Sequence, residues 1–347
     1  MANNRPTMQD IANQLGVSKN SVYLALNAKP GVSAALRERT LEAARGMGYG
    51  VFTEREIERK SRCVILVIPE YLQNDVFFYA DIVWSIDTEA ARLGLVVIKR
   101  AVTQAERGGL IMPALPADMA VVGFLVIGVL SEAYVSGLYQ TALPVLSVDI
   151  PYYDAPVGCV CTANHAGGYA AARYLIQKGH RRIGFVGPVY AARSVYERWS
   201  GFRQAMEESG LAADAPYNII GQPGRFELFD TQEALQPLFN RVDTYPSAWF
   251  CAGDRIALTT MNLLTLKGLR VPGDVSVMGF DDLSVAQMVL PKLTTMRVRR
   301  RHMGQLAVQQ LLRCAEQRQT LTYIALPCTL VERDSVKTLD KAADEAS

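Results

Sequence analysis

The chain has 347 residues, half of them apolar, and a formal net charge of +2. This length exceeds one ordinary domain, and the near-neutral charge argues against binding DNA without regard to sequence. No apolar stretch reaches the ~18 residues that a membrane span needs, and the polar start resembles no secretion signal. We therefore expect a cytoplasmic protein with no membrane partner.

The first 50 residues predict three short helices. Thr7 is a good N-cap for the first helix, Gly16 suits the turn that follows, and Ser18 and Ser33 suit the caps of the second and third helices. The first 60 residues hold nine Lys or Arg and six Asp or Glu, a net charge of +3. A helix-turn-helix of this kind places its second helix in the DNA major groove.

The second helix carries the residue types that read bases. Asn20 can pair bidentately with adenine, and Tyr23 and Leu24 can pack on thymine methyl groups. Lys19 can reach guanine or a phosphate, or it is a solvated surface lysine. The complete set of expected DNA contacts is Thr7, Ser18, Lys19, Asn20, Ser21, Tyr23, Leu24, Asn27, Lys29 and Ile57.

From Cys63 onward, apolar runs alternate with amphipathic helical patterns. Strands are expected over 63–68, 95–98, 121–127, 144–148, 182–186, 248–251 and 275–280, and helices over 78–93, 165–178, 194–209, 253–267 and 301–317. This alternation predicts an α/β fold with parallel sheets covered on both faces, and two sheets suit the roughly 270 residues better than one. The six cysteines lie within such patterns, so we expect reduced core residues rather than disulfides or a zinc site.

Several acidic residues directly follow predicted strands. They are Asp149, Asp281 and the Gly253-Asp254 pair. Ligands of open α/β sheets bind beyond the carboxyl ends of the strands, where a carboxylate can accept hydrogen bonds from sugar or nucleoside hydroxyls. A hinge or capping role is the alternative for Asp281. No nucleophile–base pair, metal-ligand cluster or phosphate loop is visible, so we expect no catalytic residue, metal or cofactor.

Short motifs mark both the head and the body. They include Met8-Gln-Asp-Ile-Ala, Gly16-Val-Ser, Asn164-His-Ala-Gly-Gly168, Gly179-His-Arg-Arg-Ile-Gly and Val271-Pro-Gly-Asp-Val-Ser. Their joint order and spacing resemble the LacI/GalR (lactose-repressor) family of transcription regulators over nearly the full chain. The resemblance implies a homodimer with paired heads on a palindromic operator. It also implies a two-lobed body like a periplasmic binding protein, with a small-molecule effector, a carbohydrate or nucleoside-like metabolite, in the cleft.

The resemblance also divides the chain. The expected parts are a helix-turn-helix head (1–50), a connector (51–62), an effector-binding and dimerisation core (63–335) and a flexible tail (336–347). Within the core, we expect lobe 1 at about 63–161 and 295–320, and lobe 2 at about 162–290 and 321–335. The expected effector contacts are Phe78, Tyr79, Asp149, Arg198, Phe226, Gly253, Asp254 and Asp281. For Arg198 a surface ion pair, and for the aromatic residues plain core packing, are the alternatives.

The chain departs from the family pattern at three places. The connector appears about two residues short and carries Glu54, Glu56 and Glu58, which phosphates would repel; Ile57 is the nearest candidate for a side chain wedged into the minor groove. Tyr23-Leu24 replaces the usual Ser-Arg of the recognition helix, which predicts an unusual operator half-site. Gly253 stands where the family usually has Asn, which favours a bulkier, less hydroxylated or aromatic effector.

These features predict an allosteric DNA-binding repressor that is not an enzyme and that relies on its second helix more than on minor-groove insertion. The alternative is a cytoplasmic solute-binding sensor whose head has weakened or lost its DNA binding.

Overall fold

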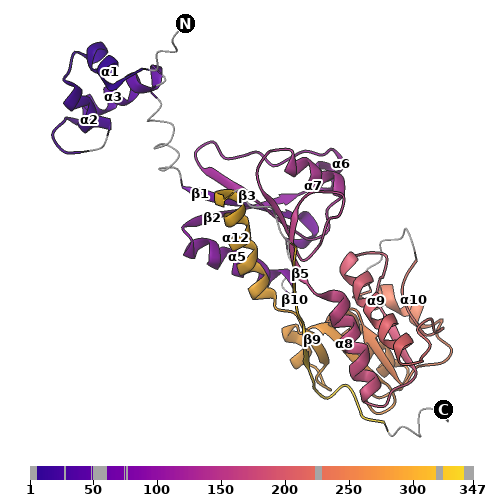
Figure 1. Ribbon diagram of the computed structural model, residues 1–347. Helices are drawn as coiled ribbons and strands as arrows, with labels where there is room; N and C mark the ends of the chain where they lie inside the picture. The colour runs from indigo at the N-terminus through magenta and orange to yellow at the C-terminus, as the bar shows by residue number, and fades with distance from the viewer. Residues whose placement is uncertain are drawn as a thin grey trace. The chain divides into compact units, whose positions relative to one another are not determined.

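The computed structural model describes residues 6–26, 29–47, 49, 61–73, 75, 77–222, 229–317 and 323–339. The chain divides into two compact units, residues 1–62 with 116–120, and residues 63–115 with 121–347. We call them the head and the body and describe each by itself (Figure 1).

The head contains three helices: α1 (Met8–Leu15), α2 (Lys19–Leu26) and α3 (Ala34–Gly46). Gly16 ends α1 with φ +66°, a left-handed conformation that glycine adopts at little cost. Ile11 and Val22 are fully buried in a small core with Ala44 and Tyr49. The predicted helix-turn-helix is therefore confirmed, and its core fixes α2 against α1 and α3.

The body contains two sheets. The first has the strand order β10-β5-β4-β3-β1-β2, and the second has the order β11-β9-β8-β7-β6. The pairs from β10 to β3 are parallel, as are those from β6 to β9, whereas β11 joins β9 antiparallel at the edge. The predicted α/β class with two parallel sheets is confirmed, with one antiparallel edge strand that the sequence did not predict.

The strands and short 3-10 turns of the body have these bounds: β1 (Arg62–Pro69), η1 (Glu70–Leu72), β2 (Leu95–Val102), β3 (Ala120–Ile127), β4 (Val145–Val148), β5 (Gly158–Thr162), β6 (Ile183–Val186), β7 (Ala248–Cys251), β8 (Ser276–Asp281), η2 (Ser284–Gln287), β9 (Thr294–Arg297), β10 (Tyr323–Leu326) and β11 (Thr329–Val331). Its helices are α5 (Tyr79–Arg92), α6 (Gln104–Gly108), α7 (Glu132–Tyr139), α8 (Asn164–Gln177), α9 (Arg193–Glu208), α10 (Gln232–Phe239), α11 (Asp254–Leu266) and α12 (Arg300–Gln317).

Each sheet defines a lobe: lobe 1 holds β10 to β2, and lobe 2 holds β11 to β6. The chain passes from lobe 1 to lobe 2 after β5, returns after β9, and passes again between β10 and β11. The expected crossings near 295 and 321 are thus corrected. Thr294–Arg297 still pairs with β8 of lobe 2, and Tyr323–Leu326 pairs with β5 of lobe 1.

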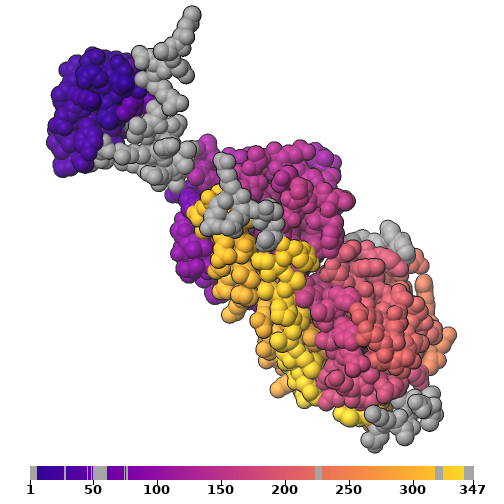
Figure 2. All heavy atoms as spheres, in the orientation of Figure 1, coloured from indigo at the N-terminus to yellow at the C-terminus, as the bar shows by residue number. Residues whose placement is uncertain are grey.

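The last described segments belong to both lobes. In Figure 1, α12 runs beside α5 although more than 200 residues separate them in the sequence. Figure 2 shows the orange and yellow C-terminal chain lying along both lobes of the body. We call the region where the chain crosses between the two lobes the seam. The candidate site lies at this seam.

Candidate DNA-contacting helix and effector site

The start of α1 is fixed by a capping box. The Thr7 hydroxyl accepts from the Asp10 amide, and the Thr7 amide donates to an Asp10 carboxylate oxygen at 2.7 Å. The hydrogen bonds from Thr7 hold the pKa of Asp10 below its usual value. Thr7 therefore acts as a cap, as its sequence position predicts.

Helix α2 is capped in the same way. The Ser18 hydroxyl accepts from the Ser21 amide at 3.0 Å and lies 2.8 Å from the Ser21 hydroxyl. The side chains of Lys19 and Asn20, in the first turn of α2, are exposed to solvent. The first turn of α2 therefore presents the groups that we expect to read DNA, held by a local hydrogen-bond network.

The remainder of α2 is more constrained. The Lys29 ammonium donates to the Tyr23 hydroxyl at 3.1 Å and lies 5.0 Å from the centre of its ring. Leu24 is half-buried, which leaves it less available than Tyr23, whose exposed fraction is 39%. Asn27 and Ile57 lie outside the described residues, so their expected DNA contacts remain predictions.

In the body, two acidic residues that follow strands have unusual backbones. Asp149 follows β4 with φ +76°, and Asp281 ends β8 with φ +110°. Left-handed φ values cost residues other than glycine free energy, and they persist where the surrounding structure enforces them, often at ligand sites. The backbone thus distinguishes these two positions from ordinary strand ends.

Asp149 is buried, Asp281 is mostly buried, and both carboxylates are incompletely paired. Asp149 accepts from the Tyr79 hydroxyl at 3.3 Å, but no donor in the described part of the chain bonds its Oδ1. Asp281 Oδ1 lies 3.4 Å from Arg198 Nη1 yet likewise accepts no hydrogen bond from the described residues. Burial raises the pKa of Asp149, and it raises that of Asp281 to about 6 against the opposing effect of Arg198. Buried polar atoms of this kind call for a partner.

Arg198 is held rigidly beside these carboxylates. Only 5% of the residue is exposed. Its Nε donates to Asn164 Oδ1 at 2.9 Å, its Nη1 donates to the Ala252 carbonyl at 2.5 Å, and its guanidinium carbon lies 3.9 Å from the centre of the Phe280 ring. A charge fixed in this way can orient a ligand without losing side-chain entropy on binding. The alternative of a surface ion pair does not fit this burial.

The packing of α8 on α9 brings Arg198 to this place. A Cβ on Gly168 would lie 2.1 Å from the Arg198 carbonyl oxygen, and one on Gly201 would lie 2.0 Å from the His165 carbonyl oxygen. The two helices therefore meet backbone to backbone. This close approach allows Asn164, at the start of α8, to bond the guanidinium of Arg198 in α9.

The Gly253-Asp254 pair serves two different purposes. A Cβ on Gly253 would lie 3.3 Å from Asp281 Oδ2, so Gly253 borders the carboxylate cluster. Asp254 is fully buried, and its oxygens accept from the Thr295 hydroxyl at 2.6 Å and the Leu283 amide at 2.7 Å. Both oxygens are thus occupied by the protein. The expected effector contact of Asp254 gives way to a structural role that joins α11 to the turn after β8.

The aromatic residues at the start of α5 border the site from lobe 1. The rings of Phe78 and Tyr79 meet edge to face with 5.0 Å between their centres, and both residues are half-buried. Asp75 Oδ1 accepts from the amides of Phe77, Phe78 and Tyr79 and so starts the helix. Phe226 lies outside the described residues, and its expected role remains a prediction.

Sequence reasoning missed three residues of this site: Asn164, Phe280 and Arg300. Asn164 and Phe280 stood inside quoted motifs, but nothing in their spacing showed that they contact Arg198. Arg300 donates to the Asp281 carbonyl at 2.5 Å and to Asp81 of α5 at 3.2 Å. Asp81 is 219 residues away in the sequence, so no local pattern could have paired them.

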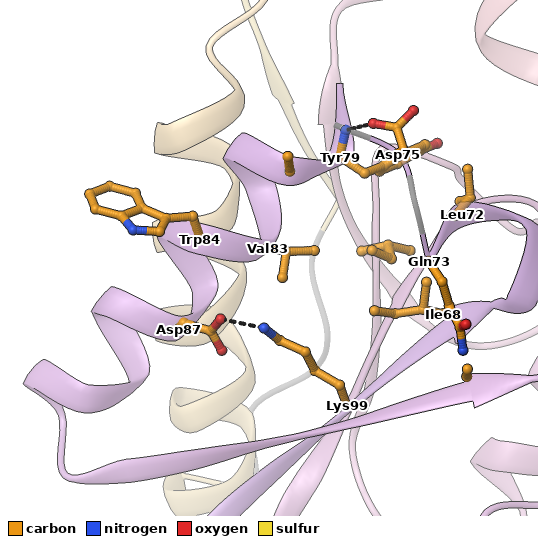
Figure 3. A pocket seen from close by; sticks show the side chains of 12 residues that line it. Ile68, Leu72, Gln73, Asp75, Tyr79, Val83, Trp84, Asp87 and Lys99 are labelled. Carbon is orange, nitrogen blue, oxygen red and sulfur yellow. Dashed lines mark hydrogen bonds and ion pairs between the residues drawn. The ribbon is translucent and has the colours of Figure 1, made fainter. Parts of the chain in front are cut away.

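A separate hollow lies in lobe 1, between α5 and the sheet (Figure 3). Its volume is about 440 Å³. Its lining is mainly apolar, with the Asp87–Lys99 ion pair at 2.6 Å on one side. Tyr79 lines this hollow while its hydroxyl bonds Asp149 of the carboxylate cluster. The hollow and the cluster are therefore neighbours on either side of one side chain.

Two further features are absent from the described residues. None of their helices is both long and apolar enough to cross a membrane. No group of three or more of their His, Cys, Asp and Glu side chains is arranged to hold a metal ion. His180, for example, is buried and bonded to the Ser247 hydroxyl and the Lys337 carbonyl, which is a structural role.

A helix-turn-helix head on a two-lobed α/β body, with a buried polar cluster at the ends of its strands, defines a class of DNA-binding regulators that respond to a ligand. The family model described as bacterial regulatory proteins, lacI family, matches residues 7–50. The model for a periplasmic binding protein-like domain matches residues 172–336. Together the two matches span more than half of the chain.

Known proteins are similar to this chain along almost its whole length. The chain is similar to the HTH-type transcriptional repressor PurR of Vibrio cholerae serotype O1, with 28% identity over 97% of this chain and 99% of that protein. It is similar to the structure of a transcriptional regulator CelR–cellobiose complex, with 25% identity, a TM-score of 0.68, and coverage of 95% and 100%. The fold also matches a lac repressor dimer bound to operator, with 24% identity, a TM-score of 0.67, and coverage of 96% and 100%.

The chain belongs to the lacI family of bacterial regulatory proteins. It is a DNA-binding transcriptional regulator, and its relatives are regulators rather than enzymes.

Proposed function

We propose that the protein is a homodimeric repressor that binds a palindromic operator, and that a carbohydrate or nucleoside-like effector in the body controls its affinity for DNA. The observation that carries the effector part is the cluster of Arg198, Asp149 and Asp281. It combines a fixed guanidinium with two buried carboxylate oxygens that lack donors from the described residues.

The chemistry of this cluster favours a ligand with several hydroxyl groups, in contrast to the less hydroxylated effector that Gly253 led us to expect. Each of the two carboxylate oxygens without a partner needs a hydrogen-bond donor, and a ligand hydroxyl supplies one without adding charge. Two acids face Arg198, and Arg300 is already paired with Asp81, so an anionic ligand is disfavoured. Phe78 and Tyr79 offer aromatic surface to a sugar face or a nucleobase. The cellobiose in the related CelR complex is a ligand of this kind.

The dimer is supported by an apolar surface on lobe 1. Strand β2 is an edge strand of its sheet. Large apolar side chains are exposed on it, on α5 and on the chain that follows: Trp84, Val96, Leu110, Ile111 and Leu115. We call this set the lobe 1 patch. Exposed apolar side chains near an unpaired strand edge are typical of a protein interface.

The head supports operator binding through the first turn of α2. Lys19 and Asn20 are exposed there, and Tyr23 follows one turn later. We propose that these residues read the bases and that the contribution of Ile57 is small. Ile57→Ala should therefore lower operator affinity by less than tenfold, about 1.4 kcal/mol.

The test has two arms. Repeated selection from random duplex pools by mobility shift should enrich one palindromic sequence, whereas no enrichment would favour a sensor without DNA binding. A thermal-shift screen of sugars, nucleosides and small acids should identify the effector, since a ligand at 100 times its Kd adds about 2.7 kcal/mol. Arg198→Ala and Asp281→Asn should abolish that shift, and its retention in both variants would refute the assigned pocket.

A further inference from the structure

The segment Asp281–Asp282 connects the candidate effector site to the seam between the lobes. Both residues have left-handed backbones, with φ +110° and +52°. Two arginines of lobe 2 hold the side chain of Asp282: Arg297 Nε donates to one oxygen at 2.6 Å, and Arg333 Nη2 donates to the other at 2.5 Å. The Asp281 carboxylate, in contrast, faces Arg198 with one oxygen unbonded by the described residues.

The backbone carbonyls of this segment are held from the other lobe. Arg300 begins α12, just after the chain has returned to lobe 1. Its Nη1 donates to the Asp281 carbonyl at 2.5 Å, and its Nη2 lies 3.3 Å from the Asp282 carbonyl. The Arg300 side chain is only 11% exposed. A single guanidinium thus supports two consecutive left-handed residues, one of which carries a candidate ligand group.

The same guanidinium is anchored in α5. Arg300 Nε and Nη2 both lie 3.2 Å from Asp81 Oδ2. The other Asp81 oxygen accepts from Arg301 at 3.3 Å, and the Arg301 guanidinium lies 5.2 Å from the ring of Trp84. A continuous set of contacts therefore runs from the Asp281 segment to the lobe 1 patch.

We propose that Arg300 is a positioning residue for Asp281 and that, together with Asp81, it couples the occupied effector site to α5. The proposal rests on the proposed function, because it assumes that Asp281 contacts the effector. A ligand that binds the Asp281 carboxylate shifts the strained Asp281–Asp282 segment. The backbone carbonyls of these two residues can then move only if Arg300 and Asp81 move as well. Lysine cannot replace Arg300, since one ammonium lacks the planar fork that reaches all these acceptors.

The first measurement needs no effector. Hydrogen–deuterium exchange is followed in the intact ligand-free protein at two segments, α5 and residues 281–283. Arg300→Lys and Asp81→Asn should each speed exchange at residues 281–283 by about tenfold. Among the hydrogen bonds of the described residues, Asp81 reaches that segment only through Arg300, so an effect there identifies the coupling.

Glu89→Gln is the matched control. Glu89 of α5 accepts from Gln309 of α12 at 2.7 Å, so it joins the same two helices as the Asp81–Arg300 pair, but within lobe 1 alone. Its loss should affect exchange in α5 and leave residues 281–283 unchanged. An unchanged segment in Asp81→Asn, or an equal effect of Glu89→Gln there, would overturn the coupling.

The second measurement uses the compound found in the thermal-shift screen. In Asp81→Asn, the compound should bind within about threefold of its parent affinity, while its effect on operator affinity should fall about threefold or more. Glu89→Gln should retain the full effect. If Asp81→Asn also retained it, Arg300 and Asp81 would not couple the sites. If the screen found no ligand, the proposed function would fail, and the exchange result would still decide whether Arg300 joins the two segments.

Discussion

Asp149, Asp254 and Asp281 each follow a strand of a parallel sheet, yet the groups around them differ. Asp254 accepts from Thr295 and Leu283, and both of its oxygens are thereby used. Asp149 and Asp281 each keep an oxygen that no described donor bonds. The position after a strand predicts nearness to a ligand cleft, and the surrounding donors decide whether the carboxylate binds a ligand or the protein itself.

The pKa of Asp254 makes the stability of the body depend on pH. Burial, with repulsion from Asp281, raises this pKa from 3.8 to about 8. Between these values the folded protein keeps a proton that the unfolded chain has released. Stability should therefore fall as the pH rises through this window, by at most about 1.4 kcal/mol per pH unit. Asp254→Asn should flatten the pH dependence of the thermal unfolding midpoint between about pH 6 and about pH 8.

A suitable control for this measurement is Asp274→Asn. The Asp274 pKa is held below its usual value by hydrogen bonds from Arg270, so it does not titrate in that window. This variant should keep the pH slope of the parent. Parallel curves for the parent and Asp254→Asn would show that Asp254 is ionised in the folded protein throughout.

Sequence reasoning reached the residues of the site unevenly, for a physical reason. Asp149, Asp281 and Arg198 could be named because strand ends and family motifs mark them. The switch of Asp254 to a structural role could not, because its donors come from positions 283 and 295. Arg300 was missed altogether, since its partners lie on another lobe and on a helix 219 residues away. Local patterns show where a side chain is, and tertiary packing chooses what it contacts.

At the scale of elements, the close contact of α8 with α9 is the feature that places Arg198. Gly168→Ala would put a methyl group 2.1 Å from the Arg198 carbonyl oxygen. Because this oxygen belongs to the backbone, no rotamer change can relieve the clash. We expect a loss of about 1–3 kcal/mol in the free energy of unfolding, together with weaker effector binding. Chemical denaturation followed by circular dichroism measures the first effect.

Gly108→Ala provides the comparison. Gly108 lies in α6 with nothing within 4 Å of an added Cβ. Because alanine favours the helix, this variant should be neutral or more stable by up to about 1 kcal/mol. Equal losses in the two variants would mean that the contact between α8 and α9 is not the cause.

Helix α2 allows a test of base reading. Asn20→Ala should cost about 1–3 kcal/mol in operator affinity and relax the preference at one base pair. Asn13, exposed on α1, is the control position, and Asn13→Ala should change affinity much less. Binding to the selected operator and to its single-base variants distinguishes the outcomes. A uniform loss over all sequences would assign Asn20 to the phosphate backbone instead.

Elements were predicted best where apolar runs are continuous. Strands β1 and β3 begin and end within a residue or two of their predicted bounds, because nearly every residue in them is buried. Strands β9, β10 and β11 escaped prediction. They have only three or four residues, and β10 and β11 expose at least half of theirs. Pairing with β8, β5 and β9 creates these strands, and no local pattern announces such pairing.

For the whole molecule, the lobe 1 patch predicts how two copies associate. Trp84 is 58% exposed and is the largest side chain of the patch. Trp84→Glu should raise the dimer dissociation constant by about tenfold or more, because a charge would replace apolar contact area. Sedimentation equilibrium measures this constant. Tyr190→Glu, at a similarly exposed aromatic residue of lobe 2, should leave it unchanged; an equal effect would place the interface elsewhere.

The order of the strands along the chain has a consequence for synthesis. Strand β10 is the last to join the first sheet, and β11 is the last to join the second. The first sheet is therefore complete only after residue 326 has left the ribosome, and the second only after residue 331. The three helices of the head, in contrast, end at Gly46. Domains fold as units during synthesis, N-terminal ones first. A nascent chain therefore acquires its helix-turn-helix well before either lobe is complete, and a chain terminated early would keep the head without the lobes to which we assign its control.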